Sequence, residues 1–265
     1  MALLVRTWNV FHGNAKPPER RTFLADAVRL ASADGPDVLC LQELPVWSLR
    51  RLEEWCGMQV VGIVASRPRP LSAELGRVLT GVHYGRLRSA FTGQANAILL
   101  AGRLKVRAID SIVLNPPGVR GAQARALGLP RRLRLAWAGE RRVCQAVRID
   151  DGERTLVVAN LHGSSVPDRR IPDMELLRAA TFADAFAEPD EPLVLAGDFN
   201  VREETSVTLA QLAGPDWGFS RPIPWLDQIL VRGAEATRPE PWPEERRRVD
   251  GRLLSDHAPV EATVG

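Results

Sequence analysis

Cysteine is scarce in this 265-residue sequence, and lysine is almost absent. The three cysteines, Cys40, Cys56 and Cys144, make an odd number and form no CxxC pair. We therefore expect reduced thiols in strands or core, and no disulfide framework. Lysine occurs only as Lys16 and Lys105, so arginine supplies nearly all of the positive charge. A bias in genomic base composition would explain this, although arginine also offers a planar fork suited to phosphate.

A long apolar run is also missing. No stretch approaches the roughly 20 apolar residues that span a bilayer. The opening MALLVRTWNVF lacks the basic start, long apolar core and cleavage site of a signal peptide. We therefore expect a cytoplasmic protein, or a secreted one whose sequence starts after processing. The net charge of +3 is mildly basic and does not by itself indicate nucleic acid. Nothing indicates a transmembrane segment or an obligate protein partner.

Neither repeats nor linkers divide the sequence, which predicts a single domain over residues 1–265. Strand-like runs alternate with helical ones, and the segment DGE (151–153) has the composition of a hairpin turn between two strands. This pattern predicts an α/β sandwich with mixed sheets. The predicted strands cover residues 3–10, 37–44, 59–65, 96–101, 106–114, 142–150, 155–162, 192–200, 226–231 and 258–264. Helices are predicted over residues 20–32, 47–55 and 171–186, and an irregular stretch over 115–140.

Polar residues stand where several predicted strands end or begin, and sites of layered α/β proteins form from such strand ends. Taken singly, most have an ordinary explanation: Asn9 as a turn cap, Glu43 as a solvated strand end, His162 as a loop histidine. GDFN has the composition of a turn. Asp227 lies among apolar residues, and a lone buried carboxylate is costly unless it is paired. The set that could converge is Asn9, Gln42, Glu43, His162, Asp198, Asn200, Asp227, Asp256 and His257.

Six ordered motifs, TWNV, LQE, NLH, GDFN, LDQIL and SDHAPV, run from Thr7 to Val260. Together they resemble the motifs of the endonuclease/exonuclease/phosphatase (DNase I-like) superfamily. This group contains DNase I, AP endonucleases, neutral sphingomyelinases and inositol-polyphosphate 5-phosphatases. The resemblance implies a four-layer α/β sandwich with two packed mixed sheets and a site at one end of both sheets. GDFN followed far downstream by SDHAPV is the most specific part of the match.

The resemblance implies a divalent metal, usually Mg²⁺ or otherwise Mn²⁺, held by Glu43 with Asn9 beside it and Asp256 as a second carboxylate. It also implies that Asp198 positions or deprotonates the attacking water, and that Asn200 binds phosphate or metal. The chemistry agrees, because hard divalent cations prefer oxygen ligands and a phosphate ester needs its charge neutralised.

Two histidines complete the implied catalytic set. His257 would contact the scissile phosphate, and Asp227 would orient its ring and make it easier to protonate. His162 matches the second histidine of the DNase I-like and sphingomyelinase-like branches. AP endonucleases generally carry a tyrosine there, so His162 argues against that branch. Arg142 resembles a phosphate-contacting arginine of the DNase I branch, and Arg141 is the alternative.

The sequence therefore predicts a metal-dependent phosphoesterase, with a nuclease acting on DNA or RNA as the leading hypothesis. A phosphomonoesterase, a lipid or small-molecule phosphodiesterase, and a non-catalytic phosphate-binding module are the alternatives. Arginines within residues 120–142 are either a solvated loop or a basic arm along a polynucleotide. Four tryptophans either pack in the core or stack on bases: Trp47, Trp217, Trp225 and Trp242.

Overall fold

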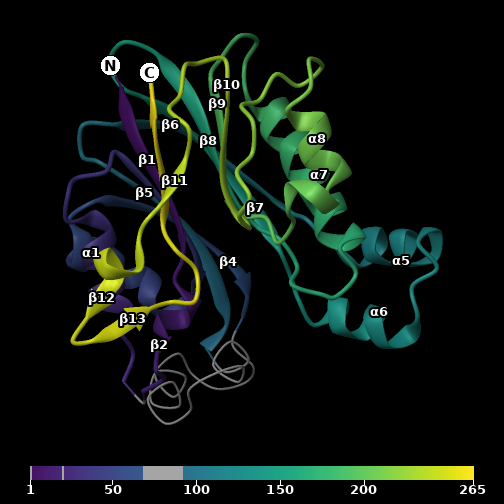
Figure 1. Ribbon diagram of the computed structural model, residues 1–265. Helices are drawn as coiled ribbons and strands as arrows, with labels where there is room; N and C mark the ends of the chain where they lie inside the picture. Colours follow the sequence, from purple (N-terminus) through teal and green to yellow (C-terminus); the bar gives the residue numbers. More distant parts are fainter. Residues whose placement is uncertain (1, 20, 68–91) are drawn as a thin grey trace.

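Two large β-sheets pack face to face in the computed structural model, which describes residues 2–19, 21–67 and 92–265 (Figure 1). The six-stranded sheet has the order β11-β14-β1-β3-β5-β4, and the five-stranded sheet β10-β9-β8-β7-β6. A small third sheet has the order β12-β13-β2. The first sheet contains β1 (Leu3–Asn9), β3 (Val38–Leu44), β4 (Gln59–Ser66), β5 (Gln94–Leu100), β11 (Glu240–Pro241) and β14 (Val260–Val264). The second contains β6 (Lys105–Val113), β7 (Val143–Asp150), β8 (Thr155–His162), β9 (Leu193–Asp198) and β10 (Asp227–Arg232), and the third β2 (Ala15–Lys16), β12 (Arg248–Val249) and β13 (Arg252–Leu254).

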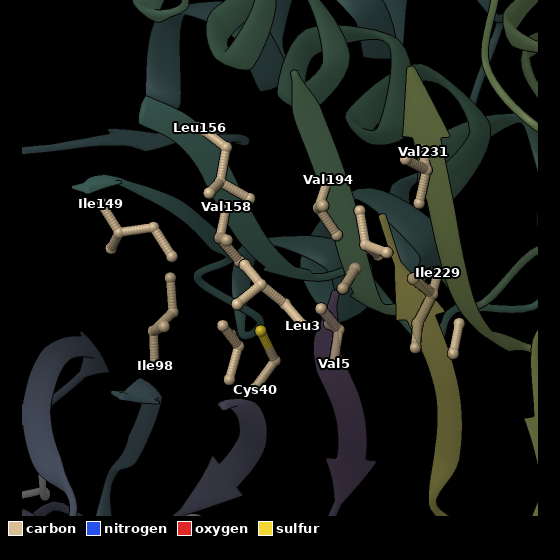
Figure 2. Close-up of a cluster of buried hydrophobic side chains, with 14 of the residues drawn as sticks. Leu3, Val5, Cys40, Ile98, Ile149, Leu156, Val158, Val194, Ile229 and Val231 are labelled. Atoms are coloured by element: carbon tan, nitrogen blue, oxygen red, sulfur yellow. The ribbon is translucent and has the colours of Figure 1, made fainter. Parts of the chain in front are cut away.

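Alternating apolar side chains fill the space between the two large sheets. Val5 and Cys40 from one sheet meet Val158 and Val194 from the other in a single buried cluster (Figure 2). Because side chains alternate across a strand, the same strands present a second apolar set to the opposite face. Both faces of the central strands are therefore buried, which explains why their sequences read as continuous apolar runs.

Helices cover the two outer faces. Helix α1 (Leu24–Ser32) packs with Leu39, Leu41 and Leu99 of the six-stranded sheet, and α2 (Leu52–Cys56) lies beside it. Helices α7 (Arg170–Phe186) and α8 (Val207–Leu212) cover the five-stranded sheet (Figure 1). The resulting order of helix, sheet, sheet and helix confirms the predicted four-layer sandwich. Short 3₁₀ segments are η1 (Phe11–Gly13), η2 (Val46–Arg50), η3 (Glu203–Thr205) and η4 (Glu244–Arg247).

The predicted irregular stretch over residues 115–140 is wrong, because two helices form there: α5 (Pro117–Ala126) and α6 (Arg131–Ala138). Prolines precede or open both helices, a position that suits proline because the first helical N–H needs no intrahelical partner. Their buried contacts are few, chiefly Trp137 in a small satellite cluster with Val166 and Ile171. This narrow apolar face, interrupted by arginines, produces too weak a periodicity to reveal the helices in sequence.

Strand directions gather the polar strand ends at one end of both sheets. Strands β1 and β3 run parallel with Asn9 opposite Gln42, and β8 and β9 run parallel with His162 opposite Asp198. Strand β10 is antiparallel to β9, so its first residue pairs with Asp198. The opposite end holds the two chain termini, where Leu3 pairs with Val264 (Figure 1). Among the described residues, no helix is both long and apolar enough to cross a membrane.

Candidate active site

Asp198 lies at the centre of the site, fully buried at the end of β9. Asn9 donates from Nδ2 to Asp198 Oδ2 at 2.9 Å, joining the ends of β1 and β9 across the two sheets. The backbone N–H of Asn200 donates to Asp198 Oδ1 at 3.0 Å, and the Asn200 amide donates to the Gly163 carbonyl. These bonds fix the Asp198 carboxylate in one orientation.

Two glycines allow β8 and β9 to approach closely at this end. Gly197 has φ 138°, and a Cβ there would lie 1.9 Å from the Leu161 carbonyl oxygen. A Cβ at Gly163 would lie 2.6 Å from the Phe199 carbonyl oxygen. Any larger residue would push His162 and Asp198 apart, so the glycine of GDFN is required by the backbone approach and not merely by a turn.

An irregularity in β3 turns the Glu43 side chain into the site. The register between β3 and β5 shifts between Leu41 and Leu44, and Glu43 has φ 55°. Such a bulge turns a side chain out of the regular alternation, here into the site. Burial raises the pKa of Glu43 to about 7, against the opposing influence of Arg142 and a hydrogen bond from Asn9. A cation bound at this carboxylate would offset the cost of burying its charge.

His257 and Asp227 form a tight pair, with Nδ1 and Oδ2 2.7 Å apart. Burial alone would lower the pKa of His257, but the Asp227 and Asp198 carboxylates outweigh it and raise this pKa to about 10. Burial raises the pKa of Asp227 to about 6 despite its cationic partner. At neutral pH the pair is therefore an imidazolium and a carboxylate. The Nε2 atom of His257 faces Asp198 Oδ2 at 3.8 Å.

His162, unlike His257, is held in the neutral state. Arg142 places Nη1 3.0 Å from His162 Nδ1, and a guanidinium can only donate, so Nδ1 must accept. Burial and the neighbouring Arg142 lower the pKa of His162 well below its usual value, which leaves the ring neutral. Its proton therefore sits on Nε2, which faces Asp198 Oδ2 at 3.5 Å and Glu43 Oε1 at 3.7 Å. Arg142 itself is buried and bonded to Glu140 and Gln94.

The other residues named in the sequence analysis differ in their exposure to solvent and in their contacts. Asp256 is exposed beside His257. Arg141 donates to the carbonyl oxygens of Val64 and Ala65 at the end of β4, whereas Arg142 reaches His162. Three tryptophans pack against neighbouring side chains: Trp47 on Trp55, Trp217 on Phe219, and Trp242 beneath Arg6 and Arg246. Trp225 is 44% exposed and stands two residues before Asp227.

Three further residues, to which the sequence analysis assigned no role in the site, also shape it. Ser255 donates from Oγ to the Asn9 carbonyl at 2.6 Å and accepts from the His257 N–H, so it joins the TWNV and SDHAPV motifs. Arg247 donates to the carbonyl oxygens of Leu254, Ser255 and His257. His12 is buried, with Nε2 3.5 Å from Glu43 Oε2. Its only sequence signal is a polar residue three positions after Asn9.

A model of the endonuclease/exonuclease/phosphatase family matches residues 7–257, which covers nearly the whole sequence, five of the six motifs in full and the first three residues of SDHAPV. The chain belongs to the endonuclease/exonuclease/phosphatase family. Members of this family are hydrolases of phosphate esters and generally depend on divalent metal ions. A comparison with curated protein sequences finds no match.

Solved structures of the endonuclease/exonuclease/phosphatase family share the fold at low sequence identity. A functionally unknown conserved protein from Enterococcus faecalis V583 has a TM-score of 0.68 at 16% identity, covering 99% of both chains. A mannosyl-6-phosphatase from Bacteroides thetaiotaomicron VPI-5482 has a TM-score of 0.66 at 14% identity, again covering 99% of both. Truncated TDP2 from Caenorhabditis elegans has a TM-score of 0.64 at 17% identity, covering 100% of this chain and 97% of that one.

Two groups of side chains offer ligands to a metal ion of the kind this family uses. Ligand atoms of Asp198, Asp227 and His257 lie within 4.8 Å of one another. In that group the His257 ring is bonded to Asp227 and protonated at neutral pH, so it presents an N–H and no lone pair. Glu43 offers carboxylate oxygens that face His12 and His162 at 3.5 and 3.7 Å and accept a hydrogen bond from the Asn9 side chain. The chemistry of the Glu43 group therefore fits a divalent cation better.

Proposed function

We propose that this protein is a divalent-metal-dependent phosphoesterase that hydrolyses phosphodiester bonds of DNA or RNA by in-line attack of water, with residues 1–265 acting as one catalytic domain. The observation that carries the proposal is the position of Asp198 between one neutral and one cationic histidine. Neutral His162 and cationic His257 face the same Asp198 oxygen at 3.5 and 3.8 Å. Phosphate-ester hydrolysis needs such a combination of an acceptor for the water proton and donors for phosphate oxygens.

Each residue then has a role that follows from its bonds. Asp198, fixed by Asn9 and Asn200, would orient the attacking water and accept its proton. His257 would donate Nε2–H to a phosphate oxygen as a full cation, and Asp227 would keep the ring charged and oriented. His162 would add a neutral N–H donor, whose tautomer Arg142 sets.

Glu43 would hold the divalent cation, with Asn9 hydrogen-bonded to Glu43 beside it and exposed Asp256 as the second carboxylate of the proposal. When bound there, the cation would neutralise charge that develops on the phosphate oxygens. Mg²⁺ is commonly held by one or two carboxylates while water and substrate phosphate fill its other positions, and this suits a site with few protein ligands.

Exposed cationic and aromatic side chains support a polynucleotide as the substrate. Helices α5 and α6 carry arginines that form no salt bridge to a carboxylate within the described part of the chain: Arg120, Arg125, Arg131, Arg132 and Arg134. Helix α6 ends four residues before Arg142, the residue that contacts His162. Guanidinium groups without a carboxylate partner suit phosphates along a strand. Trp225, exposed beside Asp227, would offer a surface on which a base could stack.

The test is a substrate panel assayed with Mg²⁺, with Mn²⁺ and with EDTA. The panel contains plasmid DNA, single-stranded DNA, RNA, bis-p-nitrophenyl phosphate and p-nitrophenyl phosphate. We expect metal-dependent cleavage of a polynucleotide, none in EDTA, and losses of several orders of magnitude in Glu43→Gln and Asp198→Asn with circular dichroism unchanged. Full activity in EDTA would remove the metal from the proposal.

A phosphomonoesterase is the second candidate, and its support is the mannosyl-6-phosphatase, which shares this fold over 99% of both chains. Rapid hydrolysis of p-nitrophenyl phosphate or a sugar phosphate, together with no cleavage of any polynucleotide, would replace the nuclease proposal with this one. The catalytic residues would be the same in both cases, because in this fold the loops around the site set the substrate.

A further inference from the structure

The loop that carries His257, between β13 and β14, directs three of its carbonyl oxygens at one side chain. Arg247, the last residue of η4, donates from Nη1 to the carbonyl oxygens of Leu254 at 3.1 Å, Ser255 at 3.2 Å and His257 at 2.9 Å. Ser255 has φ 59°, a left-handed conformation that is uncommon for serine, so the chain turns sharply at this residue. One guanidinium nitrogen thus satisfies three backbone acceptors of a single loop.

Arg247 is itself almost fully buried, with 7% of the residue exposed. Burial lowers the pKa of Arg247, against the opposing influence of the Glu244 and Asp256 carboxylates. A guanidinium nevertheless stays protonated in a protein, and a buried cation is costly unless polar groups surround it. The three carbonyl oxygens supply such groups. The Arg247 side chain and the His257 loop therefore stabilise one another.

Two separate sets of bonds restrain His257. Its ring is oriented by Nδ1, which donates to Asp227 Oδ2 at 2.7 Å. Its backbone carbonyl accepts from Arg247 and also from Trp8 Nε1, at 2.9 Å in each case. Trp8 is fully buried on β1, and the next residue of that strand bonds to Asp198. The Asp227 bond thus sets the direction of the ring, whereas the carbonyl bonds set the position of the backbone from which the ring extends.

The position of that backbone decides where the proposed donor atom lies. His257 Nε2 is 3.8 Å from Asp198 Oδ2. A misplacement of about 1 Å in an active site can cost roughly 100-fold in rate. The Asp227 bond can rotate the ring but cannot restore a displaced loop. A residue that fixes the loop is therefore as necessary for the geometry as the partner that fixes the ring.

We propose that Arg247 is a positioning residue for His257, which holds the imidazole at its distance from Asp198 by binding the carbonyl oxygens of the loop. This inference rests on the proposed function, in which His257 donates to a phosphate oxygen. In the described part of the chain, the side-chain hydrogen bonds of Arg247 all go to backbone carbonyl oxygens. Arg247 therefore acts through the backbone and touches no reacting atom.

The test is a double-mutant cycle on the full chain, with bis-p-nitrophenyl phosphate as substrate and a saturating concentration of Mg²⁺. Arg247→Met removes the donor and keeps the apolar bulk, whereas Arg247→Lys keeps a cation with N–H donors. Both are made in the wild type and in His257→Ala. Arg248→Met is the matched control, because Arg248 is an exposed neighbour that bonds to the Glu244 carboxylate. Urea unfolding and circular dichroism establish that each variant is folded.

A proton NMR spectrum supplies a second measurement, which does not depend on turnover. The proton in the short bond between His257 Nδ1 and Asp227 Oδ2 should resonate at low field, and its absence from His257→Ala assigns it. A displaced loop should shift or broaden this resonance in Arg247→Met, and do so less in Arg247→Lys. Arg248→Met should leave it unchanged.

We expect Arg247→Met to lower kcat about 10- to 100-fold with little change in KM, and Arg247→Lys to lower it less. In the His257→Ala background neither substitution should lower kcat further, because the ring through which Arg247 acts is gone. An equal loss in both backgrounds, or an unmoved low-field resonance in Arg247→Met, would overturn the inference while the proposed function stands. If the wild type hydrolysed no phosphate ester of the substrate panel, the proposed function would fail, and the resonance alone would decide whether Arg247 positions His257.

Discussion

At the scale of single residues, the site depends on how each imidazole is paired. His257 is bonded to the Asp227 carboxylate and is cationic, whereas His162 is bonded to the Arg142 guanidinium and is neutral. Both point Nε2 at the same oxygen of Asp198. The two histidines thus supply two different donors, a neutral N–H at His162 and a cationic N–H at His257. The partner of Nδ1 decides the charge of each ring.

The pairing predicts a graded series of activity losses. His257→Ala and Asp198→Asn should each lose most of kcat, and the double variant should lose less than the product of the two losses, because both side chains serve one step. Asp227→Asn should cost less than His257→Ala, since it misorients the ring without removing it. Steady-state kinetics on one substrate, at a saturating concentration of metal ion, measures kcat of these four variants. A near wild-type rate in His257→Ala would mean that the reacting phosphate lies elsewhere.

The motifs predicted the residues that meet at the strand ends, because each motif joins an apolar strand to the polar residue that follows it. Glu43, Asp198, Asp227 and His257 all lie within one such group of side chains. The roles assigned to them stay predictions. His12 could not be found in this way, since its approach to Glu43 depends on two positive φ angles that no sequence pattern encodes. Arg247 was equally hidden, because its contacts are with backbone carbonyl oxygens.

At the scale of elements, the buried carboxylate of Glu175 connects helix α6 to the loop that follows the catalytic histidine His162. Glu175 on α7 accepts from Asn115 Nδ2 at 3.0 Å, from Trp137 Nε1 at 2.8 Å, and from both the N–H and the hydroxyl of Ser164. Burial raises the pKa of Glu175, against the opposing influence of the hydrogen bonds from Trp137 and Ser164. Ser164 follows His162 by two residues, so the bonds that hold α6 also hold the loop beyond the catalytic histidine.

Glu175→Gln should destabilise the protein by about 1 to 3 kcal/mol, because an NH₂ group would face donors that have lost their acceptor. Urea unfolding measures the change, and Glu245→Gln at an exposed carboxylate is the matched control. We also expect the activity of Glu175→Gln to fall, since the loop after His162 loses its anchor. An unchanged free energy of unfolding would show that these donors find other partners.

The arginines of α5 and α6 also predict how the affinity for a polynucleotide responds to salt concentration. Each phosphate contacted by arginine contributes about −0.7 to −0.9 to the slope of log affinity against log salt. Replacing Arg131, Arg132 and Arg134 together by alanine should flatten this slope by up to about two to three units. KM on long substrates should rise, while turnover of a small phosphodiester is spared.

The matched control replaces three arginines at the other end of the sheets: Arg107, Arg154 and Arg238. It should leave the slope unchanged. Equal losses on long and small substrates in the α6 variant would assign these arginines a structural role. Helices α5 and α6 could not be predicted from the sequence, since they bury little beyond Trp137 and a few small side chains. The strands of the two central sheets were predictable because they are buried on both faces.

At the scale of the whole molecule, a cluster of charges joins β1, β14 and the segment that follows α1. The guanidinium of Arg6 on β1 is fully buried and lies 2.7 Å from Asp34 and 2.5 Å from Glu261 on β14. Its bond to Arg6 lowers the pKa of Asp34. Burial would raise the pKa of Glu261, but hydrogen bonds from Trp242 and Arg6 outweigh it and lower this pKa.

The cluster predicts a specific loss of stability in acid. A carboxyl group whose folded pKa is depressed stabilises the protein above its unfolded pKa, here 3.8 for Asp34 and 4.5 for Glu261. That stability is lost as the pH falls through the lower folded values. Glu261→Gln should therefore be less stable than the wild type at pH 7, and the difference should shrink below about pH 4.5. Urea unfolding between pH 7 and pH 3 measures it, and a constant difference would contradict the assignment.

The contact between Ser255 and Asn9 has a consequence for the timing of activity during synthesis. The two residues are 246 positions apart, yet the Ser255 hydroxyl bonds to the Asn9 carbonyl and β14 lies beside β1. Domains generally fold as units, as soon as the required segments have left the ribosome. A nascent chain carries Asn9 and Glu43 early, but it has no His257 and no neighbour for the open edge of β1 until nearly all 265 residues are made. The proposed nuclease would thereby stay inert beside the messenger RNA and ribosomal RNA that surround it during its own translation.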